Sequence, residues 1–293
     1  MKIILSRKGF DSGIGKTPSP IFPSQELRSL PIPELSQIAE PLRYADIQTG
    51  NYALGGLVNN LTRGKITPAT PVHLDPDLDQ ASRPRPVHWK PLFGQADAAE
   101  GHLRKCNVQA GDIFLFYGWF RQIEAINGEF RYVPGAPDLH VIFGWLQIEQ
   151  RIEVANRADL PVWALNHPHC RRSSHGLDAL YIASDSLQLP GLSTNKPGGG
   201  VFPAFNSARC LTAPVASLGV SKRSIWQLPA WFHPDGRASC LTYHGTAARW
   251  TKMGEHVHLQ TVGRGQEFVL DSEDYPEVFE WLAGILNAGE NSP

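Results

Sequence analysis

Residues 111–120 read GDIFLFYGWF and residues 138–148 read DLHVIFGWLQI, and these two segments decide the fold. Both are rich in aromatic and β-branched residues, which strands favour, and Gly-rich or charged turns flank them. They predict two strong strands. Residues 2–5 and 179–183 are shorter apolar runs that predict two more. Because no βαβ rhythm runs along the chain, we expect an α+β fold: a strand-rich mixed sheet or barrel-like core with a few peripheral helices.

Two segments have the apolar spacing of helices. Residues 92–105 carry one stripe from Leu92 to Leu103 at positions i, i+4, i+7 and i+11. A second stripe follows Pro276 and includes Val278 and Leu282, with Pro276 in the first turn. We therefore predict a helix over residues 92–105 and another near the end of the chain.

The composition is that of a globular, loop-rich protein. Of 293 residues, 42% are hydrophobic and 19% are charged, which allows a sizeable core. The 27 glycines and 24 prolines exceed the combined average share of about 12% and favour a loop-rich and strand-rich fold. We expect one domain over residues 1–293, in which a subregion of residues 1–90 packs on a β-rich core of residues 91–293.

Charge and cysteine content exclude several classes of protein. The net charge of −1 gives no global signal for nucleic acid, so such a role needs a local basic patch. The four cysteines form no CxxC pair, which argues against a disulfide framework or a thiolate zinc site. No apolar run approaches the ~18–20 residues of a membrane span. We expect a cytoplasmic protein without a membrane partner.

Histidine and aspartate recur at strand spacing. Residues 72–78 read VHLDPDL, so an extended chain places His73 and Asp75 on one face before Pro76 ends the strand. His167 and His169 have the same spacing, and so have His256 and His258. Such pairs line a solvated polar face in most chains. Two imidazoles and a carboxylate are also typical of a divalent metal site. The candidate metal ligands and catalytic residues are His73, Asp75, His167 and His169.

Two other segments have candidate chemistry. Asp138 and His140 are an oriented acid/base pair or a polar strand end, since a carboxylate fixes the tautomer of an imidazole. The loop of residues 6–20 is not a Walker motif, because Phe10 stands where its first glycine belongs and prolines follow at once. Glycines beside Lys8 still allow a phosphate to approach. Lys8 is a phosphate ligand or part of a solvated turn.

An ordered set of short motifs runs along nearly the whole chain. It comprises SRKGFDS (6–12), SPI (19–21), LPIP (30–33), HLDPDL (73–78), FGQ (93–95), HL (102–103), GDIFLFYGWF (111–120), DLHVIFGWLQI (138–148), HPH (167–169), LYIASD (180–185), LPAWF (228–232) and GQEFVLD (265–271). Together these motifs resemble the nucleotide modification associated domain family of the third type. The resemblance implies an intracellular protein of bacterial or phage systems that modify nucleic acids, acting on modified nucleotides or alongside other modification-system proteins.

The resemblance also extends the set of candidate site residues. Its motifs add a substrate-binding set: Lys8, Asp11, Ser12, His102, Gln266, Glu267 and Asp271. The two aromatic segments also resemble the strand pair of PUA-like barrels, which hold a flipped base. In that interpretation Trp119, Phe143 and Trp145 stack on a base, whereas the alternative is that they are core residues.

Three functions remain open from the sequence. The first is an enzyme that acts on nucleobases or nucleotides through the His and Asp residues, with a divalent metal as the one cofactor considered. The second is a non-catalytic reader of modified DNA bases. The third is an iron- and 2-oxoglutarate-dependent oxygenase, in which His258 and Arg264 complete a site begun by His73 and Asp75.

Overall fold

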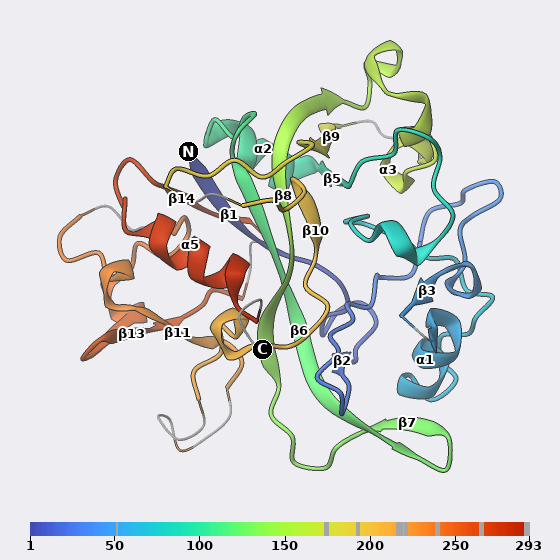
Figure 1. Cartoon of the computed structure of the whole chain (residues 1–293), viewed down its shortest axis with the longest axis horizontal. Helices are drawn as coiled ribbons and strands as arrows, with labels where there is room; N and C mark the ends of the chain where they lie inside the picture. Colours follow the sequence, from blue (N-terminus) through green and yellow to red (C-terminus); the bar gives the residue numbers. More distant parts are fainter. Residues whose placement is uncertain are drawn as a thin grey trace.

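The computed structural model describes residues 1–50, 52–172, 176–191, 194–214, 219, 222–237, 241–263 and 267–289. Its centre is formed by the two segments that dominate the sequence. Strand β6 spans Ile113–Ile126, strand β8 spans Leu139–Glu153, and the two pair antiparallel. Figure 1 shows them as the long green ribbons that run through the middle of the molecule.

β6 and β8 belong to a mixed sheet that has nine strands among the described residues. Its main path runs β14-β1-β6-β8-β9-β5, with β1 parallel to β6 and the other neighbours on this path antiparallel. The remaining strands are β1 (Lys2–Arg7), β5 (Leu92–Ala96), β9 (Asp178–Ala183) and β14 (Glu267–Asp271), and off the path β2 (Ser19–Ile21), β7 (Glu129–Tyr132) and β10 (Gly199–Val201).

Smaller elements surround this sheet. A second sheet has the order β11-β13-β12, and a short hairpin joins β3 to β4. These strands are β3 (Gln48–Thr49), β4 (Tyr52–Ala53), β11 (Ile225–Pro229), β12 (Trp250–Met253) and β13 (His256–Gln260). The α-helices are α1 (Leu54–Leu61), α2 (Asp97–Lys105), α3 (Pro168–Arg171) and α5 (Val278–Asn287). The 3₁₀ turns are Tyr44–Asp46, Gln80–Ser82, Arg157–Asp159, Val162–Ala164, Ser207–Arg209, Ala230–Phe232 and Ala247–Arg249.

Alternation along the strands divides the core between two faces of the main sheet. Ile3 and Leu5 of β1 pack with the second sheet and α5 on one face. Ile4, between them, packs with Phe114 and Phe116 on the other. A strand buried on both faces reads as a continuous apolar run, which explains the sequence of residues 2–5.

The main sheet curls until its two edge strands approach each other. Gln95 of β5 donates a side-chain hydrogen bond to the carboxylate of Glu267 on β14. Lys8, just after β1, lies 3.1 Å from the same carboxylate. Side chains bridge the two edges, and no backbone pairing between β5 and β14 occurs in the described residues. The expected α+β, strand-rich mixed sheet with few helices is confirmed, and it is an open sheet and not a closed barrel.

The helix expected over residues 92–105 is wrong in its first part. Residues Leu92–Ala96 form β5 and pair antiparallel with β9, and the helix covers only Asp97–Lys105. Backbone pairing with β9 overrode the helical spacing of Leu92 and Ala96. The last helix, α5, lies where its apolar stripe predicted it. None of the described helices is long and apolar enough to cross a membrane.

Candidate metal centre

The segment with the His-Asp motif is anchored at both ends. The backbone N–H of His73 donates to the carbonyl of Ile32 at 2.9 Å. Asp77 exchanges two backbone hydrogen bonds with Leu92 of β5, at 2.9 and 3.0 Å. Residues 73–77 therefore connect the N-terminal part of the chain to the edge of the main sheet, and Asp75 lies beside β5.

Asp75 is the centre of a cluster that also contains His73, His167 and His169, and these four residues are called the His-Asp cluster below. Oδ1 of Asp75 accepts the backbone N–H of Gly94 at 2.7 Å and lies 3.3 Å from Nε2 of His167. Oδ2 lies 3.7 Å from Nε2 of His169. Only 6% of the Asp75 side chain is exposed, so these neighbours and not water compensate its charge.

Carboxylates orient two of the three histidines. Oε2 of Glu34 lies 2.7 Å from Nδ1 of His73, and Oδ1 of Asp178 lies 2.6 Å from Nδ1 of His169. A carboxylate at Nδ1 holds the ring proton there and leaves the lone pair of Nε2 free. Metal-binding histidines are held by such partners, which fix the ring and raise its basicity as a ligand.

The third histidine is held differently. His167 caps the short helix α3, where its Nδ1 accepts the backbone N–H of His169 at 3.4 Å. The proton of a neutral His167 is therefore on Nε2, close to Asp75. This buried Nε2 lies 3.3 Å from Oδ1 of Asp75, but makes no well-aligned hydrogen bond in the described part of the chain. His167 is thus set up to hold or transfer a proton, whereas His73 and His169 present lone pairs.

The two histidines His73 and His169 and the carboxylate of Asp75 lie close together. One ligand atom from each of His73, Asp75 and His169 lies within 4.8 Å of the other two. A tetrahedral ion with bonds of about 2.0 Å keeps its ligand atoms about 3.3 Å apart, so binding would draw the ligand atoms together by up to about 1.5 Å. The geometry admits a divalent cation with two imidazoles and one carboxylate.

Electrostatics keeps the ligands in the forms that bind cations. Burial raises the pKa of Asp75, but its interactions with the three surrounding histidines outweigh burial and hold the pKa well below its usual range. Burial also raises the pKa of Glu34, but hydrogen bonds from His73 and Ser36 outweigh it and lower the pKa to about 2. The pKa of His169 is lowered, because burial disfavours the imidazolium more than Asp178 favours it. Asp75 and Glu34 are therefore ionised, and His169 is neutral.

Gly94 is required where the histidine ring meets the sheet. A Cβ atom at this position would lie 2.4 Å from Cγ and 2.4 Å from Cδ2 of His169. No side chain fits there without moving the ring. The glycine also donates the backbone N–H that holds Asp75. The FGQ motif therefore serves two structures: Gly94 supports the His-Asp cluster, and Gln95 bridges the sheet edges.

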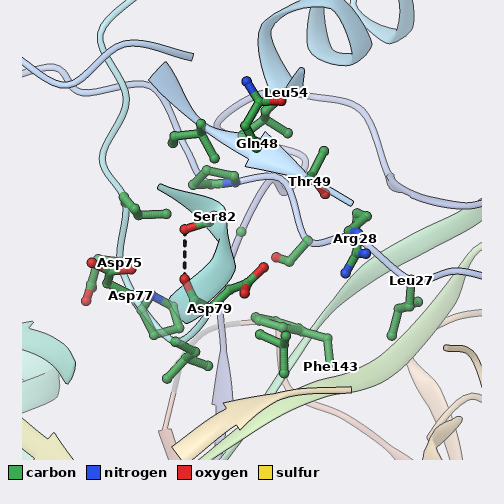
Figure 2. Close-up of a pocket in the computed structure, with 18 residues that line it drawn as sticks. Leu27, Arg28, Gln48, Thr49, Leu54, Asp75, Asp77, Asp79, Ser82 and Phe143 are labelled. Atoms are coloured by element: carbon green, nitrogen blue, oxygen red, sulfur yellow. Dashed lines mark hydrogen bonds between the residues drawn. The ribbon is translucent and has the colours of Figure 1, made fainter. Parts of the chain in front are cut away.

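A pocket extends from Asp75 and is lined by the N-terminal part of the chain and by residues of β8 and β10. Figure 2 shows Asp75 and Asp77 on one side of it, Arg28 on the other, and Phe143 of β8 close by. The lining is mostly apolar, with aliphatic side chains such as Leu27 and Leu74, and it also carries polar side chains, among them Gln48 and Arg28. Ser82 Oγ donates to the carbonyl of Asp79 at 2.8 Å and closes the turn at this edge. A small ring compound with hydrogen-bonding groups matches this lining.

Three residues of the expected substrate-binding set meet elsewhere. Lys8 lies 3.1 Å from Glu267 and 4.4 Å from the centroid of Phe93, and both charged side chains are buried. His102, on α2, lies 3.1 Å from Thr242 Oγ1. Burial lowers the pKa of His102, and the negative charge of Glu267 offsets only part of this effect. These residues form a polar contact between sheet edges and are separate from the His-Asp cluster.

Asp138 and His140 do not form a pair in the structure. Oδ1 of Asp138 accepts Nε1 of Trp119 at 2.7 Å and lies 2.7 Å from Arg121. His140 instead accepts Nε1 of Trp226 at Nδ1, at 2.9 Å. The two side chains have different partners, so Asp138 does not orient the imidazole of His140 as the sequence pattern predicted.

The remaining candidates are dispersed. Asp11 turns the first loop by accepting two backbone N–H groups, each at 2.7 Å, and Ser12 is exposed beside it. Asp271 pairs with Lys2 at 2.9 Å. His258, which the oxygenase hypothesis required, lies on β13 at 3.4 Å from Gln227. Gln266 and Arg264 lie outside the described residues.

The aromatics expected to stack on a base are mostly core residues. Phe143 is 5% exposed and Trp145 is 6% exposed, and each belongs to a hydrophobic cluster. Trp119 is half-buried and donates to Asp138. The reader function thus has only Trp119 as a partly accessible ring among these three.

The sequence did not indicate the carboxylates behind the histidines. Glu34 is 39 positions from His73, and it follows the LPIP motif without any local pattern of its own. Asp178 is nine positions from His169, at the start of an expected strand. Only the tertiary fold brings these residues together. The one available sequence signal was the position of Glu34 directly after the LPIP motif.

The fold and the His-Asp cluster define an α+β protein with a candidate divalent-cation centre. A family model described as nucleotide modification associated domain 3 matches residues 2–271. The chain therefore belongs to this family, and membership suggests a role in nucleic-acid modification. Searches of curated proteins and of solved structures each found no significant match.

Proposed function

We propose that this protein is a metal-dependent enzyme that acts on a nucleobase or nucleotide in a nucleic-acid modification system. One observation carries the proposal: Glu34 and Asp178 occupy Nδ1 of His73 and His169, which leaves Nε2 of each ring free to bind an ion, and one ligand atom of each of His73, Asp75 and His169 lies within 4.8 Å of the other two. Histidines that bind metals almost always donate their other ring N–H to a partner of this kind. The family supports the class of substrate.

The donor set favours a transition metal over magnesium or calcium. Imidazole ligands suit zinc, iron and related ions, whereas Mg²⁺ and Ca²⁺ prefer oxygen. His73, Asp75 and His169 are the proposed ligands, and a fourth position is left for water or substrate. An ion with an open position lowers the pKa of bound water to about 7. His167 is the proposed proton carrier, because its buried Nε2 lies 3.3 Å from Asp75 without a well-aligned hydrogen bond among the described residues.

The adjacent pocket is the proposed substrate site. Asp75 lines it, so a ligand in the pocket lies next to the cluster. Leu27, Leu54 and Leu74 offer an apolar surface to a planar ring, and Arg28 and Gln48 offer hydrogen bonds. These features match a nucleobase better than an extended apolar ligand.

The test is a metal-dependent reaction. The purified protein is incubated with nucleotides and short oligonucleotides that carry modified or unmodified bases, and products are detected by mass spectrometry. We expect a product that disappears in His73→Ala and His167→Ala. His256→Ala is the matched control, because His256 is exposed on β13. Full activity of both cluster variants would sink the proposal.

A second candidate is the iron-dependent oxygenase. The set His73, Asp75 and His169 has the two-histidine, one-carboxylate composition of such sites, with His169 in place of the expected His258. This candidate requires bound iron and consumption of 2-oxoglutarate coupled to substrate. A protein that contains zinc and consumes no 2-oxoglutarate removes it and leaves the first proposal standing.

A further inference from the structure

Three arginines gather where β1, β6 and β8 meet at one face of the main sheet. Arg7 of β1 lies opposite Tyr117 of β6, and Trp119 lies opposite His140 of β8. Leu5 and Tyr117 pack on the face that meets the second sheet. Side chains two positions apart share a face, so Arg7 and Trp119 project there as well.

Arg7 has no counter-ion among the residues that the structure describes. No hydrogen bond or ion pair of its guanidinium occurs within the described part of the chain. It is half-buried, so it is not a freely solvated side chain. A guanidinium in this position leaves five N–H donors for another acceptor.

Arg223 is similarly short of acceptors. Its guanidinium stacks on the ring of Trp119 at 4.1 Å from the centroid. Its closest carboxylate oxygen is Oδ2 of Asp138 at 3.9 Å, whereas Arg121 takes Oδ1 of Asp138 at 2.7 Å. Asp138 is thus engaged mainly by Arg121. The positive charges of Arg7 and Arg121 oppose that of Arg223, and burial and these charges lower its pKa.

His140 adds a neutral donor. Because Trp226 donates to Nδ1, the proton of the neutral imidazole is on Nε2, and no acceptor for it is found among the described residues. Burial and the charges of Arg223 and Arg7 lower the pKa of His140 to about 3, so the ring stays neutral at physiological pH. The group therefore combines two arginines and one N–H donor, with too few acceptors for them in the described segments.

The charge of Asp11 favours the charged form of Arg223, but Asp11 forms no ion pair with Arg7 or Arg223 among the described residues, and its Oδ1 accepts two backbone N–H groups of its own loop. Guanidinium groups bind phosphate oxygens in a planar, bidentate manner that few other anions match. We propose that Arg7, Arg223 and His140 form a phosphate-binding site that holds a phosphate group of a nucleotide or of a nucleic-acid backbone. This site shares no residue with the His-Asp cluster, so its test is independent of the proposed metal chemistry.

Binding measurements distinguish the two sources of phosphate. A fluorescent single-stranded oligonucleotide of about 12 nucleotides is titrated with the protein and followed by anisotropy at several salt concentrations. A nucleoside monophosphate and inorganic phosphate are then used as competitors. Displacement by the monophosphate at concentrations near those of the oligonucleotide assigns the site to free nucleotides. Tight oligonucleotide binding that the small phosphates displace only weakly assigns it to the backbone.

Single-residue variants test the site itself. Arg7→Gln and Arg223→Gln should each raise Kd about tenfold, because each removes charged hydrogen bonds. Each should also reduce the salt slope by about 0.7 for every phosphate that the variant no longer neutralises. Arg223→Lys keeps the charge and should bind more tightly than Arg223→Gln. The affinity still missing relative to the parent then reflects the loss of the planar, bidentate guanidinium.

The matched control is Arg131→Gln, which removes the same charge from an exposed ion pair with Glu124. We expect it to leave Kd unchanged. Metal content and melting temperature of the two site variants should equal those of the parent, which excludes loss of the fold. Equal affinity of parent, site variants and control would overturn the proposal, and so would a parent that binds none of the three phosphate compounds.

Discussion

Nδ1 of His169 lies 2.6 Å from Oδ1 of Asp178, and Arg172 holds the other oxygen of that carboxylate at 2.8 Å. This chain of contacts fixes the ring of His169 with Nε2 toward Asp75. We predict that Asp178→Asn lowers metal affinity by about 10–100-fold while the fold persists, because the amide no longer orients and polarises the ring. Competition with a coloured chelator measures the change. Asp185→Asn, an exposed site, is the control, and an unchanged affinity in Asp178→Asn would show that the carboxylate does not support a ligand.

Gly94 should tolerate no side chain. Its Cβ position lies 2.4 Å from two ring atoms of His169, so Gly94→Ala must displace the ring or the strand. We expect metal binding to be lost and stability to fall by about 1–3 kcal/mol. Gly56→Ala is the matched control, because nothing lies within 4 Å of its Cβ position and it sits inside α1. That variant should be stabilised by about 0.5–1 kcal/mol in a chemical denaturation experiment. Retention of metal by Gly94→Ala would contradict the close packing.

Lys8 and Glu267 should act as a structural pair. Their side chains are 9% and 1% exposed, so Lys8→Met leaves a buried carboxylate without its cation. We expect a loss of about 3–5 kcal/mol in unfolding free energy. The double variant Lys8→Met/Glu267→Gln should recover much of this loss, which a double-mutant cycle measures. Additive losses would mean that the two residues do not act as a pair, and reopen their expected role in substrate binding.

His140 should make stability depend on pH. Its pKa is lowered from 6.5 to about 3 in the folded chain, so the unfolded chain binds this proton more tightly. The unfolding free energy then falls as pH drops below 6.5, by up to about 1.4 kcal/mol per pH unit from this group. His140→Asn keeps an acceptor for Trp226 but cannot be protonated, and should flatten the curve between pH 7 and 5. Identical slopes for parent and variant would refute the assignment.

The sequence predicted the centre of the fold, because a dense run of aromatic and β-branched residues is a local property. It misjudged residues 92–96, since pairing with β9 is decided by a segment more than 80 positions away. The His-Asp motif and the HPH motif supplied the four residues that the structure brings together. The strand spacing expected for His167 and His169 is not what brings them together, because His167 caps the helix α3 and His169 lies within it.

Other parts of the site required the tertiary structure. Glu34 and Asp178 have no motif of their own, and only the folded chain reveals them as partners of histidines. The Lys8–Glu267 contact spans 259 positions and depends on the curl of the sheet. Asp138 and His140 satisfied a sequence pattern, but the neighbouring Trp119 and Trp226 compete for their hydrogen bonds.

Elemental analysis of the protein, purified without added metal, tests the central claim most directly. We predict about one transition-metal ion per chain in the parent, and its loss in the double variant His73→Ala/His169→Ala. The variant His256→Ala should keep the ion, since it lies outside the cluster. A parent that contains no metal and binds none on addition of zinc, iron or manganese would contradict a metal centre at His73, Asp75 and His169.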